Sequence, residues 1–470
     1  MTALATRDYA LDGTESRRAV DRGLADAEWF QADIDPATLR ELTVRQNLRP
    51  ALDIILWLAL IFGFGALAWS LRGSWWALPA FFAYGALVGG SSDARWHECG
   101  HGTAFRSQWL NDLIYYPASF MLAREATYWR WSHFRHHTDT IIVGRDAEII
   151  FPRPPSVGRL VWMFTHIQGG STLIWTTVKH AMGRSDANVE VLVPEQERGR
   201  VFWEARVYVL IWTATIVWAI ATASFYPLLL IGGPTIYGAW LVLFFGVTQH
   251  AGLKEDVLDH RKSTRTVLMN PIFRFLYLNM NYHIEHHMFP AVPYYNLPRL
   301  HREIRDQLPE PMPNTVATYK EIVHAFRMQA QDPTWELPRE IPDAPGHRGP
   351  IVQGFEWVGE KAFGDGFDLG PADLADGEMR PVEIDGVSRL VVAAEGEIFL
   401  VDRVCTHGDA DLSAGIVLGC ELECPKHNGR FDLRTGEGTR RPIKEALATY
   451  EIRIRAGRIV FDHHQNESNS

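Results

Sequence analysis

Three short segments of this 470-residue chain are dense in histidine. Residues 97–101 read HECGH, 133–137 read HFRHH and 283–287 read HIEHH. Spacings of three and four residues place side chains on one helix face, a turn apart, so their imidazole nitrogens can converge on a metal. Iron is favoured over zinc and copper for such a site if it carries out O₂ chemistry. Eight ligands are too many for one ion, so two irons are expected.

The expected ligands from the three segments are His97, His101, His133, His136, His137, His283, His286 and His287. A ninth candidate, His250, stands alone at the end of an apolar run. An isolated histidine is more often structural than functional. The histidines at positions 166, 180, 260, 301 and 324 are therefore expected to be surface or core residues. Two alternatives stay open for Glu98 and Glu285, which either orient imidazole N–H groups or are solvated helix-face charges.

Two further pairs of metal-binding residues lie near the C-terminus, Cys405-Thr-His407 and Cys424-Pro-Lys-His427. A Rieske [2Fe–2S] cluster has two thiolates on one iron and two imidazoles on the other. A zinc site would also accept two cysteines and two histidines, but its usual spacing keeps the cysteines together and the histidines together. The alternation of Cys and His within each pair therefore favours the Rieske cluster. Cys99 and Cys420 are expected to be buried thiols.

Long uncharged stretches flank the histidine segments. Residues 54–71 and 75–92 each lack charge for about the length of a membrane helix, and 207–253 has room for two more. Buried core helices of a soluble protein are the alternative. Residues 113–123 and 161–178 are expected to be interfacial pieces. Four spans would place all the histidine segments on one side, which the arginine-rich loop 95–135 identifies as cytosolic.

The C-terminal part of the chain differs in composition from the rest. Five prolines lie within residues 331–350, which predicts a flexible linker. Short β-like runs follow. From residue 351 onward there are 22 acidic and 13 basic residues, so this part carries most of the net charge of −10 of the whole chain. No basic tract suggests binding to nucleic acid. The predicted parts are an N-terminal segment 1–50, a membrane domain 51–330, the linker 331–350, an all-β domain 351–464 and a tail 465–470.

The histidine segments and their flanks resemble the membrane fatty-acid desaturase and alkane-hydroxylase superfamily over about residues 50–305. The tracts HECGHGTAF at 97–105 and NMNYHIEHHMFPAVP at 279–293 look most like its rhizopine-oxygenase branch, which is thought to demethylate an O-methyl inosamine. The resemblance implies two histidine-bound irons, O₂ activation, four transmembrane helices and a cytosolic helical cap. It assigns the ligand role to the eight segment histidines and suggests a ninth histidine outside them.

Residues 351–462 resemble Rieske ferredoxins, chiefly through the tract CPKHNGRFDLRTGE at 424–437. The resemblance assigns the cluster to Cys405, His407, Cys424 and His427. One departure is Asn428, where a glycine is common. The cysteine pair that bridges the two loops in high-potential Rieske proteins is missing.

The sequence thus predicts a helical integral membrane domain followed by an all-β Rieske domain. The expected function is a di-iron oxygenase that takes electrons from a flavin- or ferredoxin-type reductase through its own cluster and hydroxylates or demethylates a small-molecule or lipid substrate. A desaturase with the same metal chemistry and a membrane-anchored electron carrier are the alternatives. The expected location is the bacterial inner membrane, with both termini, the di-iron site and the Rieske domain on the cytoplasmic side.

Overall fold

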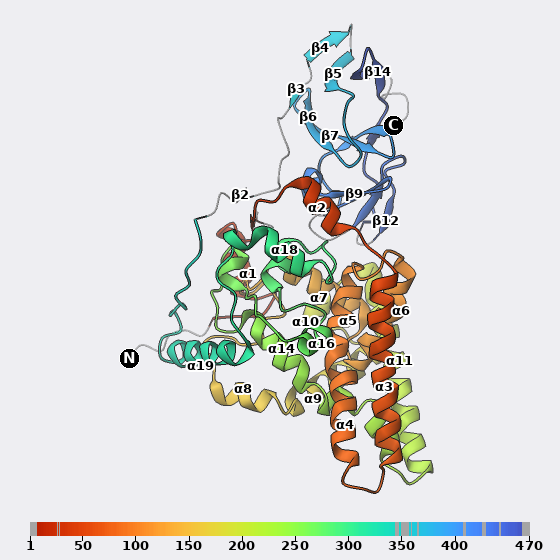
Figure 1. The fold of residues 1–470 in the computed structure, drawn as a ribbon, viewed down its shortest axis with the longest axis vertical. Helices are drawn as coiled ribbons and strands as arrows, with labels where there is room; N and C mark the ends of the chain where they lie inside the picture. Colours follow the sequence, from red (N-terminus) through yellow and green to blue (C-terminus); the bar gives the residue numbers. More distant parts are fainter. Residues whose placement is uncertain are drawn as a thin grey trace. The chain divides into compact units, whose positions relative to one another are not determined.

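The computed structural model describes residues 7–25, 27, 29–343, 347–348, 357–358, 360–363, 366–407, 410–424, 429–440 and 443–462. The chain divides into two compact units, one of residues 1–34 and 42–345 and the other of residues 35–41 and 346–470. The first unit is helical and the second is built mainly of β-strands (Figure 1).

Long helices form one side of the first unit, where α3 (Leu48–Ser70) packs against α4 (Ala77–Gly85) (Figure 1). The predicted second span is α4 followed by the π-helix η1 (Ala86–Ser91), and η1 runs directly into α5 (Ser92–His101). This uninterrupted helical path leads from an apolar stretch to the first histidine segment. π-Helical turns are rare in proteins, and those that occur often lie at functional sites.

The apolar stretch 207–253 is organised differently from two long spans. Its first helix, α11 (Glu195–Ala221), begins twelve residues earlier and includes charged residues, and the rest is broken into α12 (Tyr226–Leu230), α13 (Pro234–Tyr237) and α14 (Trp240–His250). The break before α13 follows from Gly232, whose φ of +82° suits glycine, and from Pro234 at the first position of that helix.

Among the described residues, two helical stretches are long and apolar enough to cross a membrane, 37–70 and 195–221. Only 22% and 28% of their most apolar windows are buried. Side chains such as Phe62 on α3 and Leu210 on α11 are exposed. These two helices are therefore not the buried core helices that a soluble protein would need.

The remaining helices of this unit surround the histidine segments. Those that carry or border them are α6 (Gln108–Met121), α7 (Ala126–Thr138), α9 (Ile167–Ala181), α10 (Ala187–Leu192), α15 (His260–Ser263) and α17 (His283–Met288). Farther along or outside them lie α1 (Thr14–Asp21), α8 (Val157–Met163), α16 (Pro271–Leu276), α18 (Leu297–Ile304), η2 (Arg305–Gln307), α19 (Thr315–Gln331) and the short strand β1 (Phe30–Gln31).

The described part of the predicted linker is held against the first unit. The carbonyl oxygens of Pro333 and Trp335 accept hydrogen bonds from Arg153, and that of Pro342 accepts one from Arg261. These hydrogen bonds attach residues 333–342 to the rest of the first unit, and the linker 331–350 stays a prediction. Pro345 and Pro350 lie outside the described residues.

The described residues of the second unit contain three small sheets, in the strand orders β12-β11-β10-β9, β13-β8-β7-β6-β3 and β14-β15-β5-β4. Neighbours are antiparallel except for β3 and β6, and in the β6–β7 pair Val382 stands opposite Arg389. The bounds are β2 (His347–Arg348), β3 (Trp357–Val358), β4 (Glu360–Phe363), β5 (Gly366–Pro371), β6 (Met379–Ile384), β7 (Val387–Ala394), β8 (Glu397–Asp402), η3 (Leu412–Ala414), β9 (Ile416–Leu418), β10 (Glu421–Glu423), β11 (Arg430–Asp432), β12 (Gly438–Arg440), β13 (Thr449–Tyr450), β14 (Arg453–Arg455) and β15 (Arg458–Asp462), with α2 (Pro36–Thr43) earlier in the chain.

Candidate di-metal histidine site

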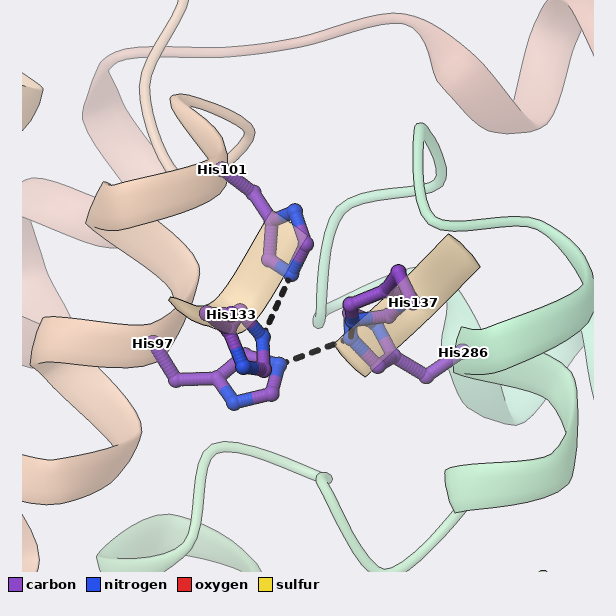
Figure 2. A group of neighbouring side chains, drawn as sticks. All are labelled: His97, His101, His133, His137 and His286. Carbon is purple, nitrogen blue, oxygen red and sulfur yellow. Dashed lines mark hydrogen bonds between the residues drawn. The ribbon is translucent and has the colours of Figure 1, made fainter. Parts of the chain in front are cut away.

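The structure brings all nine candidate histidines together in the first unit. They form two groups, and within each group the nearest ligand nitrogens all lie within 4.8 Å of one another. The first group consists of His97, His101, His133, His137 and His286 (Figure 2). The second consists of His136, His250, His283 and His287. His250 is partly exposed and the other eight are buried.

Helices α7 and α17 each contribute to both groups. On α7, His133 and His137 are four residues apart and lie on one face, while His136 is turned toward the second group. On α17, His286 joins the first group and its neighbour His287 joins the second. The spacing predicted that these residues bind metal, but only the helix positions show how they divide between the two groups.

The contacts between imidazoles fit bound metal ions. The Nε2 atoms of His97 and His286 lie 2.7 Å apart, and those of His101 and His133 lie 3.0 Å apart. Two nitrogens that bind one ion at about 2.1 Å and at right angles stand about 3 Å apart. Within the described part of the chain, Nε2 of His250 has no hydrogen-bond partner although it is buried. Neutral imidazole nitrogens that face one another at these distances could act together as ligands of one cation.

The opposite ring nitrogens of several ligands are fixed by oxygen atoms. The Nδ1 atom of His136 lies 2.8 Å from a carboxylate oxygen of Asp146, and that of His133 lies 3.3 Å from Glu148. Nδ1 of His287 contacts the Thr140 hydroxyl at 3.1 Å. Such partners hold a metal-binding imidazole in the right tautomer and orientation.

Of the two alternatives for Glu98 and Glu285, that of solvated charges is wrong, and the imidazole that Glu285 contacts belongs to His301, outside the three segments. Both are fully buried, so neither is a solvated charge. Glu98 accepts hydrogen bonds from Thr103 and from the backbone N–H of Tyr294, and burial raises its pKa to about 8. Glu285 contacts Thr266 and His301 instead of a segment histidine. The carboxylates that contact the candidate ligands His136 and His133 lie after α7, where no spacing in the sequence marks them.

The electrostatics of the clusters favour neutral imidazoles. Burial, together with repulsion from the neighbouring rings, lowers the pKa of His97, His137 and His286 well below its ordinary value. Burial alone would also lower the pKa of His136, but the carboxylates of Asp146 and Glu148 raise it to about 9. Metal binds the neutral form, so a bound cation would displace the proton from His136.

His260 approaches the site without belonging to either group. Its ring stacks on Trp29 with 4.2 Å between centroids, and lies 5.0 Å from the ring of His287. It is buried, as expected for a structural histidine. Cys99 and Cys420 are buried free thiols, as predicted.

A cavity of about 280 Å³ adjoins both histidine groups. Its lining includes His97 and His133 from the first group and His136, His250 and His283 from the second. A molecule in this cavity would lie beside both metal positions.

In the second unit, two loops begin with buried cysteines. Cys405 follows β8 and donates its backbone N–H to Ala410 at 2.9 Å, and Cys424 follows β10 and donates to Gly429 at 2.7 Å. Both side chains belong to one apolar core cluster. Two buried thiols from two closed loops fit the thiolate half of a Rieske cluster. His407 is partly exposed, and His427 lies outside the described residues.

Comparison with known proteins agrees with this division. The profile of the family "Fatty acid desaturase" matches residues 73–317, more than half of the chain. The chain belongs to the fatty acid desaturase family. The profile "Rieske [2Fe-2S] domain" matches residues 368–451, so this desaturase-family protein also contains a Rieske electron-transfer domain. It is an oxidative enzyme of the desaturase and hydroxylase kind.

The similar curated proteins align with about a fifth of the chain. The ferredoxin component of the naphthalene 1,2-dioxygenase system of Pseudomonas putida is 37% identical over 91 residues, which are 19% of this chain and 88% of that protein. The ferredoxin component of the p-cumate 2,3-dioxygenase system of the same organism is 37% identical over 92 residues, 19% of this chain and 78% of that one. A ferredoxin structure from Sphingomonas yanoikuyae B1 is 34% identical, covers 20% of this chain and 96% of its own, and has a TM-score of 0.20.

Proposed function

We propose that this protein is a membrane-bound di-iron oxygenase that hydroxylates or oxidatively demethylates a substrate with O₂ and with electrons relayed by its own Rieske cluster. The observation that carries the proposal is the cavity that both histidine groups line. The resemblance of 97–105 and 279–293 to the rhizopine-oxygenase branch favours oxygen insertion over desaturation.

The nine histidines would hold two irons, and these would supply the activation of O₂ that the histidines themselves cannot perform. The carboxylates of Asp146 and Glu148 keep His136 and His133 in position. Hydroxylation of a C–H bond consumes O₂, two electrons and two protons, and releases the alcohol and one water. When the carbon is an O-methyl group, the hydroxylated product breaks down to the free alcohol and formaldehyde.

The electrons would enter through the second unit. Cys405, His407, Cys424 and His427 would bind the cluster, which would supply one-electron transfer between a flavin- or ferredoxin-type reductase and the di-iron site. The ferredoxin components that resemble this domain belong to dioxygenase systems. In this chain the carrier would be covalently joined to the oxygenase, which replaces diffusion with a high effective concentration.

The membrane placement is part of the proposal. The stretches 48–70, 77–92, 195–221 and 226–250 would form four passes in the bacterial inner membrane, with the histidine site, the Rieske domain and both termini on the cytoplasmic side. Two exposed apolar helices and the membrane-bound nature of the desaturase family support it. The domain boundaries 51–330 and 351–464 belong to the same proposal.

Product analysis under ¹⁸O₂ tests the function. Full-length protein, NADH and a ferredoxin reductase are incubated with candidate methyl ethers, and the products are identified by mass spectrometry. Hydroxylation adds one labelled oxygen to the product, and demethylation releases one formaldehyde for each alcohol formed. A product that has lost two hydrogens and carries no label would show desaturation instead. His136→Ala protein measures the background.

A further inference from the structure

A groove lies between α14, α16 and α19, and none of the nine candidate ligands lines it. Its floor is aromatic and consists of Phe244 on α14, Phe273 on α16 and Tyr319 on α19. The rings of Phe244 and Tyr319 stack with 5.6 Å between centroids, and Phe273 meets Phe244 edge-on at 5.5 Å. The groove has a volume of about 810 Å³, which is within the range of ligand-binding clefts. It therefore offers an apolar surface large enough for part of a lipid.

One wall of this groove is basic. Lys320 and Arg327 on α19 line it, and both side chains are exposed. Their spacing of seven residues places them on one face of the helix, two turns apart. Glu321, the one acidic residue of α19, pairs with the buried Arg265 at 2.8 Å. Among the described residues no carboxylate forms an ion pair with Lys320 or Arg327, so the wall presents two positive charges.

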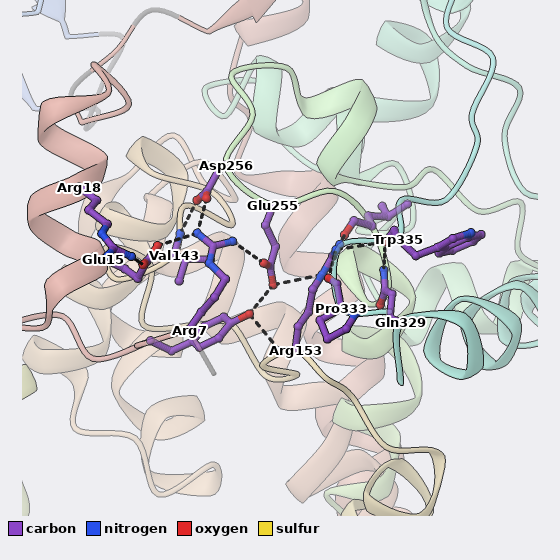
Figure 3. A network of polar contacts seen from close by, with 12 residues as sticks. Arg7, Glu15, Arg18, Val143, Arg153, Glu255, Asp256, Gln329, Pro333 and Trp335 are labelled. Atoms are coloured by element: carbon purple, nitrogen blue, oxygen red, sulfur yellow. Dashed lines mark hydrogen bonds and ion pairs between the residues drawn. The ribbon is translucent and has the colours of Figure 1, made fainter. Parts of the chain in front are cut away.

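The side of α19 that faces the rest of the first unit is held in place. Gln329 donates a hydrogen bond to the carbonyl oxygen of Gly252 at 2.9 Å. Beyond the end of the helix, Arg153 donates to the carbonyl oxygen of Trp335 at 3.2 Å (Figure 3). The ring of Trp335 packs edge-on against that of His324, with 5.7 Å between centroids. These contacts fix the orientation of α19, so its basic face is in place before a ligand binds, which lowers the entropic cost of binding.

Exposed apolar side chains lie on the helices around the groove. On α8, Val161 keeps 66% of its surface exposed and Trp162 keeps 49%, and on α16 Ile272 keeps 70%. Phe164, which directly follows α8, lies 6.4 Å from Tyr319 between ring centroids, so α8 ends beside the groove. Exposed tryptophan and aliphatic side chains next to basic residues are typical of the membrane–water interface. This part of the surface therefore suits contact with lipid headgroups.

We infer that the groove binds an anionic phospholipid of the surrounding membrane. The hydrocarbon of the lipid lies on the three aromatic rings, and its phosphate lies between Lys320 and Arg327. A purely apolar ligand would leave the two cations unpaired, and a small inorganic anion would leave the aromatic floor in water. Because no candidate ligand lines the groove, the lipid is a bound partner and not the substrate. The inference goes beyond the proposed oxygenation and rests only on its membrane placement.

Native mass spectrometry of full-length protein, extracted from the membrane fraction, tests this inference. The protein is titrated in detergent with phosphatidylglycerol and with phosphatidylcholine that carries the same acyl chains. Phosphatidylglycerol is expected to bind about 25-fold more tightly, because each basic side chain contributes about fivefold to the binding of an anionic lipid. The Lys320→Gln/Arg327→Gln variant should bind both lipids equally, whereas Lys320→Arg/Arg327→Lys should keep the preference of the wild type.

Arg302→Gln/Arg305→Gln is the matched control, because it removes two exposed positive charges that do not line the groove. It should keep the lipid preference, and all three variants should unfold at the temperature of the wild type. The inference is overturned by equal preferences in wild type and Lys320→Gln/Arg327→Gln, by an equal loss in the control, or by displacement of the lipid with excess inorganic phosphate. Recovery of the wild type in the soluble fraction would overturn the membrane placement as well. Since turnover is not measured, all these outcomes are separate from the ¹⁸O₂ result.

Discussion

At the residue scale, His136 and His286 serve different histidine groups and give the sharpest test of two metal positions. Replacing either with alanine should remove a ligand from one group and lower the iron content by about one of the two non-cluster irons. Turnover should fall to background in both variants, while the visible spectrum of the Rieske cluster stays unchanged. Metal analysis and absorption spectroscopy on purified protein check this.

His324→Ala is the matched control, because this histidine is exposed on α19 and lies outside both groups. It should keep the iron content and the activity of the wild type. If the His136 and His286 variants retained both irons and turnover, the assignment of the two groups as a di-iron site would be wrong.

Asp146 tests whether a carboxylate that contacts a candidate ligand affects the affinity for iron. Asp146→Asn keeps the size of the side chain but weakens its hold on His136, so iron affinity should fall about 10–100-fold. Glu98→Gln is the control, since Glu98 is equally buried and its carboxylate contacts Thr103 and Tyr294 instead. Competition with an iron chelator measures both affinities. Equal affinities in the two variants would contradict the role given to Asp146.

At the scale of elements, a buried histidine ties together three helices. Nδ1 of His180 on α9 lies 3.0 Å from Glu125, which precedes α7, and its Nε2 lies 3.4 Å from Asp186, which caps α10. Burial alone would lower the pKa of His180, but the two carboxylates raise it to about 9. The contact therefore fixes the start of α7, the helix that carries three of the candidate ligands.

Stability should depend on pH through this contact. An unfolded histidine has a pKa of about 6.5, so the stabilisation is fully present below about pH 6.5 and is lost as the pH rises through about 9. His180→Gln should be less stable at pH 6.5 by about 1–3 kcal/mol and should lack this alkaline decrease. Thermal unfolding across this range measures it, with His324→Gln as control. Parallel profiles for His180→Gln and wild type would show that His180 is not the titrating group.

At the scale of the whole molecule, the two units should be separable. The C-terminal unit begins at residue 346, and its Rieske domain aligns with 88% of the length of a ferredoxin component. Residues 346–470 expressed alone should bind a [2Fe–2S] cluster. This fragment should also remain soluble, because the 22 acidic and 13 basic residues from position 351 onward give it a net negative charge. Residues 1–345 should keep the histidine-bound irons but turn over only when the Rieske fragment is added.

Absorption spectra and metal content of the two fragments decide the outcome. Residues 35–41 belong to the same compact unit as residues 346–470, although they lie early in the chain. A second fragment, in which residues 35–41 are joined to 346–470, should therefore be measured in the same way. A C-terminal fragment that holds no cluster in either form would show that the boundary is misplaced.

Much of the candidate site could be predicted from local sequence. Spacings of three and four residues within one helix are a local property, and they identified all eight segment histidines that the structure brings together. The alternation of Cys405 with His407 and of Cys424 with the following histidine is local too, and it indicated the Rieske domain. The apolar stretch 54–71 predicted most of α3 for the same reason.

Only the tertiary structure decided how distant segments meet. The division of His136 and His137 between the two histidine groups depends on the rotation of α7 against α5, α14 and α17. The ion pair of Asp93 with Arg124 and the role of Asp146 behind His136 also depend on where loops return in space. Periodicity reports which face of a helix a residue occupies, and it contains no information about which other element that face will contact.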